Sequence, residues 1–126
     1  IWSLLPCSPL INFKDLRRLC FKIEKEKLKK PIISVCQYNA PIEWAFKKKK
    51  DNLLVPINKK KQNLPSQSFQ KKFYDVGVLS VFDKKNFKRK KKYFPGNFYG
   101  FELPFEKSVD IDSVDDWEFA KKLFKK

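Results

Sequence analysis

Residues 108–117 read Ser-Val-Asp-Ile-Asp-Ser-Val-Asp-Asp-Trp, and the rest of the chain is organised around them. Alternate residues of an extended backbone point to the same side. Asp110 and Asp112 are therefore expected to point together. Val109 and Ile111 would then enter the core, as the last residues of a strand.

A helix-start signal follows this stretch directly. Ser113 can cap a helix, and Asp116 stands three residues later, as in a capping box. In open α/β sheets, ligands bind at the carboxyl ends of the strands. Two neighbouring carboxylates there, Asp110 and Asp112, suit a hard cation such as Mg2+ held between protein and phosphate. The alternative is that these acids serve only the helix start, where negative charge is favourable.

The composition indicates one folded domain. The chain has 126 residues, of which 42% are hydrophobic and 16% aromatic, which is enough to build a core. No apolar run approaches the ~20 residues that span a bilayer, so no membrane segment is expected. Cys7, Cys20 and Cys36 are odd in number and widely spaced, and there is no histidine. We interpret them as reduced structural thiols in a cytoplasmic protein.

The net charge of +15 raises the hypothesis of a Lys-rich module that binds nucleic acid or another polyanion. Nearly all of the positive charge is lysine, and arginine occurs only at positions 17, 18 and 89. Arginine is the preferred residue for forked contacts to phosphates and bases. The lysines are also scattered along the whole chain, as a general compositional drift would produce. Nucleic-acid binding is therefore the less favoured alternative.

The order of apolar runs predicts an α/β fold. Residues 1–5 and 32–38 read as core strands, and 13–29 as an amphipathic helix between them. A crossover of this length makes a βαβ unit and hence a parallel sheet. Further along we expect a hairpin at 44–57, a polar loop at 58–68, strands at 73–82 and 98–103, and helices at 83–90 and 114–124, with a turn at 95–97.

The first residue of the chain already belongs to a strand-like run. The sequence contains no methionine, and Ile1 has no polar segment before it. We therefore expect the chain to be the C-terminal part of a longer protein.

Three short motifs resemble, in order, those of the acylneuraminate cytidylyltransferases, the CMP-sugar synthetase family. Residues 5–10 read LPCSPL, similar to the family's Q-P-T-S-P-L. Residues 65–77 carry PSQSF and then FYDVG, similar to R-S-Q-D-L and Y-H-D-A-G. Residues 109–117 read VDIDSVDDW, which resembles D-I-D-T-P-E-D-W. The second motif, together with PIEWAF at 41–46, favours the pseudaminic acid branch of this family.

The resemblance implies a three-layer, mostly parallel Rossmann-like nucleotidyltransferase sheet whose N-terminal nucleotide-binding part is missing. It implies transfer of CMP from CTP to a nine-carbon keto-sugar acid, with release of pyrophosphate. Asp110 and Asp112 would be the catalytic residues and would hold Mg2+. A homodimer is implied, within a single domain 1–126, with 44–105 as an insertion for dimerisation and sugar binding. Four residues would line the sugar side: Ser8, Gln67, Asp75 and Gly77.

The chain departs from the family pattern at four positions: Leu5, Pro65, Ser68 and Tyr74 replace Gln, Arg, Asp and His. An arginine at 65 would be expected to grip the sugar carboxylate. The family's glycine-rich nucleotide loop has no counterpart in this Gly-poor chain, so we expect the chain alone not to bind CTP well or to turn over. A diverged, inactive relative is a further alternative.

Overall fold

The computed structural model describes residues 1–84 and 97–125, and the chain divides into two compact units. The first unit comprises Ile1–Cys36 and Asp75–Lys126, and the second Gln37–Tyr74. The predicted insertion, 44–105, overlaps the second unit over residues 44–74 and stays a prediction. Most of the predicted helix 83–90 and most of the predicted turn 95–97 lie outside the described residues.

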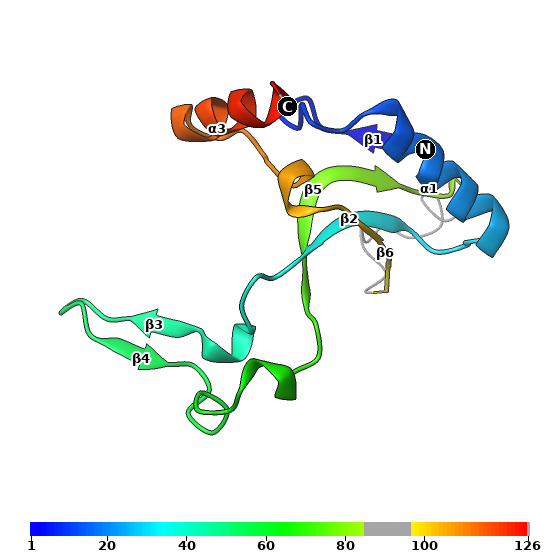
Figure 1. The fold of residues 1–126 in the computed structure, drawn as a ribbon. Helices are drawn as coiled ribbons and strands as arrows, with labels where there is room; N and C mark the ends of the chain where they lie inside the picture. Colours follow the sequence, from blue (N-terminus) through cyan, green and yellow to red (C-terminus); the bar gives the residue numbers. More distant parts are fainter. Residues whose placement is uncertain (85–96, 126) are drawn as a thin grey trace. The chain divides into compact units, whose positions relative to one another are not determined.

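The first unit contains a four-stranded sheet in the order β1-β5-β2-β6 (Figure 1). β1 pairs antiparallel with β5, with Ser3 opposite Ser80, whereas β2 pairs parallel with β6, with Ser34 opposite Phe101. The strands are β1 (Trp2–Leu4), β2 (Ile32–Gln37), β5 (Phe73–Val81) and β6 (Tyr99–Glu102).

β5 runs opposite to β2, and this makes the sheet mixed. The backbone N–H of Tyr38, just after β2, donates to Lys72 O, just before β5, at 2.9 Å. The N–H of Leu79, near the end of β5, donates to the Ser34 hydroxyl inside β2 at 3.0 Å. A chain that returns beside the point it left can pair only antiparallel, as in a long hairpin.

The α/β class is therefore confirmed, but the mostly parallel, three-layer arrangement is not. β1 and β2 both run opposite to β5, so they share one direction and are joined through a helix, as the βαβ prediction requires. β5 lies between them, and antiparallel neighbours predominate among the described strands.

Two helices start at the caps that the sequence predicts. α1 (Phe13–Glu26) begins at Asn12, whose side chain accepts from the backbone of Asp15 while the Asp15 carboxylate accepts from Asn12 N. It ends earlier than the predicted residue 29, because Lys27 adopts a left-handed conformation at φ 47°. α3 (Val114–Phe124) begins with the predicted capping box of Ser113 and Asp116.

The core of the first unit is small, and several residues predicted to be inside are not. Phe13 and Cys20 of α1 are exposed, as are Trp117 and Phe124 of α3, so each helix buries a narrower stripe than predicted. β1, at one edge of the described sheet, is also exposed. The buried apolar residues are Leu19, Ile32, Cys36, Val76, Val78, Leu79, Phe101, Leu103 and Ala120.

The predicted strand at 109–111 is wrong. The chain leaves β6 through a 3-10 turn, η3 (Phe105–Lys107), and 108–112 joins no strand ladder. Val109 and Ile111 are only half-buried. The Ile111 N–H instead donates to Cys7 O at 3.1 Å, because this segment runs beside the loop after β1.

The second unit is built on the predicted hairpin. β3 (Phe46–Lys48) pairs antiparallel with β4 (Leu54–Pro56), and Asn52 has the positive φ of 63° that the turn requires. Two 3-10 turns complete it, η1 (Ile42–Trp44) and η2 (Ser66–Ser68). Within the described ranges, no helix is long and apolar enough to cross a membrane.

Ser34 gives a test of the β2–β5 contact. Its side chain is fully buried and accepts the Leu79 N–H in place of a backbone carbonyl. Ser34→Ala leaves that donor unsatisfied and should lower the free energy of unfolding by about 1–3 kcal/mol. Urea denaturation measures the change, and Ser3→Ala, on the exposed strand β1, is the control, expected within about 0.5 kcal/mol. Equal changes in the two variants would show that the hydrogen bond from Leu79 N–H to the Ser34 hydroxyl does not stabilise the sheet.

Candidate functional site

The loop after β1 and the segment before α3 meet in the first unit. The hydrogen bond from Ile111 N to Cys7 O joins their backbones. The Ser8 hydroxyl oxygen and Asp110 Oδ1 are both buried, and neither has a hydrogen-bond partner among the described residues. Buried polar atoms are nearly always satisfied, so two such atoms on adjoining segments point to a group that the chain itself does not supply.

Cys7 belongs to the same cluster. A hydrogen bond from its side chain to the Asp110 carboxylate is the main reason why the pKa of the Cys7 thiol lies above its ordinary value, and partial burial adds to it. The thiol therefore stays protonated at neutral pH and donates to the carboxylate. We call Cys7, Ser8 and Asp110 the loop cluster. The sequence pattern predicts only a structural thiol at Cys7, although this residue lies in the same motif as Ser8.

The other acids of this region have different surroundings. Asp116 is occupied at the helix start: its Oδ2 accepts from Ser113 N at 2.9 Å and from the Ser113 hydroxyl at 2.7 Å. The Ser113 hydroxyl bond, with help from the Asp112 N–H, holds the pKa of Asp116 below its usual value. Asp112 is exposed, whereas Asp110 is half-buried. The capping role therefore belongs to Asp116 and leaves Asp110 unexplained.

The surroundings of the Asp110 carboxylate are compatible with a bound cation. Within residues 1–84 and 97–125, no three His, Cys, Asp or Glu side chains gather as a metal centre. Mg2+, however, is often bound by one or two carboxylates together with water and substrate phosphates. A buried carboxylate oxygen without a hydrogen-bond donor is an oxygen that such an ion would satisfy. The assignment of Mg2+ to Asp110 and Asp112 remains a prediction.

Asp75 and Gly77 shape the start of β5. Asp75 Oδ1 accepts from Gly77 N at 2.9 Å, and Gly77 has φ +74°, which favours glycine. A β-carbon on Gly77 would lie 3.7 Å from Leu5 Cδ1, and Leu5 N donates to Val78 O at 3.0 Å. Gly77 therefore lies against the residue that leads into the loop cluster, while Asp75 is exposed and stabilises this bend.

Gln67 belongs to the second unit, whereas the other predicted sugar-side residues belong to the first. It lines a pocket of about 290 Å3 formed by residues of 37–41 and 66–72. Lys72, which lines this pocket, forms an ion pair with Glu43. Glu43 is buried, and this contact holds the pKa of its carboxyl group below the usual value. No pattern in the sequence predicts that Glu43 is buried.

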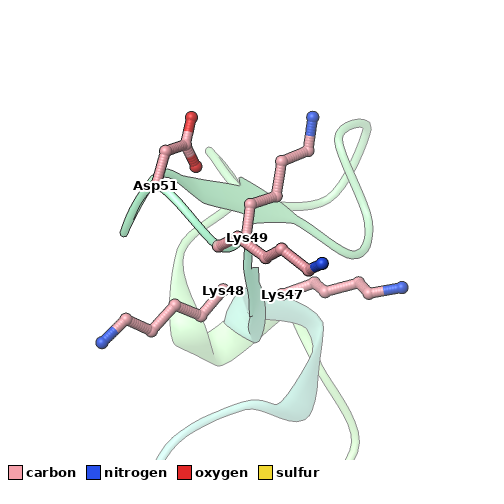
Figure 2. A pocket seen from close by; sticks show the side chains of 5 residues that line it. Lys47, Lys48, Lys49 and Asp51 are labelled. Atoms are coloured by element: carbon pink, nitrogen blue, oxygen red, sulfur yellow. The ribbon is translucent and has the colours of Figure 1, made fainter.

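A second hollow, of about 500 Å3, lies at the hairpin and is lined by Lys47–Lys50 and Asp51. Figure 2 shows Lys47 and Lys48 pointing to opposite sides, as successive residues of a strand do. Their ammonium groups do not converge on one ligand. This geometry is typical of solvated charge and gives the nucleic-acid alternative no built site.

Two curated relatives match nearly the whole chain. The pseudaminic acid cytidylyltransferase of Campylobacter jejuni subsp. jejuni serotype O:2 is 27% identical over 125 residues, which cover 99% of this chain and 53% of the relative. The enzyme of the same name from serotype O:23/36 is 26% identical over the same shares. No family model matches. The resemblance drawn from the motifs is confirmed, and the chain spans about half the length of the curated relatives it matches.

The loop cluster predicts how Cys7 reacts. Only the thiolate is alkylated, so the pH at which iodoacetamide labels Cys7 at half its maximal rate should lie above that of an ordinary cysteine thiol. Asp110→Asn removes the carboxylate and should move the Cys7 profile to lower pH. Mass spectrometry of timed digests measures each site separately. Asp112→Asn is the matched control, and equal profiles in the two variants would rule out the Cys7–Asp110 contact.

Proposed function

We propose that this chain is part of a cytidylyltransferase that transfers CMP from CTP to a nine-carbon keto-sugar acid and releases pyrophosphate. The carrying observation is the loop cluster: Asp110 has a buried, unpartnered carboxylate oxygen beside the Ser8 loop, within two of the motifs that the family resemblance uses. The names of the relatives make pseudaminic acid the first substrate to test. A neuraminic-type acid is the second.

In this proposal Asp110 and Asp112 hold Mg2+, which would neutralise phosphate charge and orient the sugar oxygen toward the α-phosphorus. The protein's own part is positioning. Cys7 donates to the Asp110 carboxylate and restrains its orientation, and the backbone bond at Ile111 fixes the segment that carries it.

The residues proposed for the sugar side are Ser8, Asp75 and Gly77 of the first unit and Gln67 of the second. The buried Ser8 hydroxyl lies beside the Cys7 thiol, and in this proposal it would turn to the sugar. Gly77 keeps the adjoining strand close to Leu5, and Asp75 stabilises that conformation from outside. Gln67 would contribute from the pocket of the second unit.

The remaining parts of the proposal concern the whole protein. We infer a three-layer nucleotidyltransferase sheet, which the shared direction of β1, β2 and β6 supports. We also infer a cytoplasmic homodimer. Leu54 and Ile57 of the hairpin region are exposed, and a two-stranded hairpin is marginal without a partner surface.

A chimera tests this function. The region of the Campylobacter jejuni serotype O:2 relative that matches this chain is replaced by it, and the product is assayed with CTP, Mg2+ and pseudaminic acid. We expect CMP-sugar and pyrophosphate by 31P NMR. Asp110→Asn should lower the rate by about 100-fold or more, because it removes charge stabilisation at the reacting phosphate.

Asp115→Asn, on the exposed first turn of α3, is the matched control and should keep the rate. A folded chimera without activity would favour the inactive-relative alternative. Full activity in the Asp110→Asn variant would remove the proposed role of this carboxylate.

A further inference from the structure

The pocket of the second unit has a definite chemical character. Its volume of about 290 Å3 is near the lower end of the ~300–1,000 Å3 usual for ligand sites, so it fits a monosaccharide-sized molecule better than a nucleotide. Two chain segments form its walls. The hydrogen bond from Tyr38 N to Lys72 O holds them together, and Trp44 Nε1 fixes the adjoining loop by donating to Leu64 O at 3.2 Å.

The two lysines of this pocket and the Glu43 carboxylate that pairs with one of them carry a net charge of one positive unit. Lys71 and Lys72 line it, and its lining contains no acidic residue. The charge of Lys72 is compensated by its ion pair with Glu43, whose side chain is 9% exposed. Lys71 has neither an ion-pair nor a hydrogen-bond partner within the part of the chain that the structure describes, and its side chain is exposed. The pocket therefore presents one uncompensated ammonium group.

The neutral groups around Lys71 suit a polyhydroxylated ligand. Asn39, Gln67 and Gln70 bring side-chain amides, which both donate and accept hydrogen bonds. Tyr38 and Phe69 add aromatic surface for the apolar face of a sugar ring. Tyr38 is itself held in place, since its ring lies 5.0 Å from that of Tyr74.

We propose that this pocket binds the sugar acid, with Lys71 as the group that pairs with the sugar carboxylate and thereby selects an acidic sugar over a neutral one. The inference rests on the proposed function for the identity of the sugar. The family resemblance leads one to expect an arginine at position 65 that binds the sugar carboxylate, but this chain has proline there. In our proposal Lys71 supplies that positive charge instead. Lys72 cannot take that role, because its charge is compensated by Glu43.

Binding of pseudaminic acid and of its methyl ester to the whole 126-residue chain tests the assignment, by saturation-transfer NMR without CTP or metal. Lys71→Met should weaken binding of the acid about three- to tenfold, because it removes a solvent-exposed, charge-assisted contact. The methyl ester carries no charge, so its binding should not change. Lys71→Arg should keep the affinity for the acid. Lys48→Met, on the hairpin of the same unit, is the matched control and should bind the acid as the unaltered chain does.

The outcomes separate this inference from the proposed function. Equal affinity of Lys71→Met and Lys48→Met for the acid would overturn it, as would equal loss for acid and ester or no binding of the acid by the unaltered chain. A loss confined to the acid would support it even if the chimera makes no CMP-sugar. Conversely, the chimera could be active and Lys71→Met could leave its KM for the sugar unchanged. That result would support the proposed transferase function and contradict a role of Lys71 in sugar binding.

Discussion

The first unit depends on the insertion of β5 between β1 and β2. That strand has neighbours on both sides, and it supplies buried Val76, Val78 and Leu79 to the core. Its pairing is not fully regular: Gly77 adopts a positive φ, and Leu79 donates to a serine side chain where a carbonyl would ordinarily accept. Leu5 lies against Gly77 and donates its N–H to Val78 O at 3.0 Å. The loop that follows Leu5 carries Cys7 and Ser8, so the site inherits its position from β5.

The acids before and within α3 have different surroundings although they lie in one short segment. The Asp116 carboxylate accepts hydrogen bonds from two N–H groups and a hydroxyl at the helix start. Asp110, six residues earlier, meets a thiol and keeps one buried oxygen unsatisfied. A capping carboxylate stabilises its helix wherever the helix lies. An unsatisfied buried oxygen lowers stability, so it is better understood as a feature kept for a ligand.

Local features of the fold were predictable from the sequence, and those that depend on distant parts of the chain were not. The caps at Asn12 and Ser113 were predicted because their partners lie three residues away. The place of β5 was not, since it depends on where a segment of more than thirty residues returns. The alternation of Val109 to Asp112 fits a strand equally well, but the Ile111 N–H found its acceptor in a loop instead of a ladder. Of the candidate site, Ser8 and Asp110 adjoin one another through this bond, while Cys7 and Glu43 had no signal in spacing alone.

The second unit begins and ends at neighbouring points, since Tyr38 and Lys72 share a backbone hydrogen bond. Loop-closure entropy rises only slowly with length, so residues can be gained, lost or exchanged between these points at little cost to the sheet. Selection can therefore act on this segment as an exchangeable module. Its hairpin and its pocket can change without altering the strand pairing of the first unit.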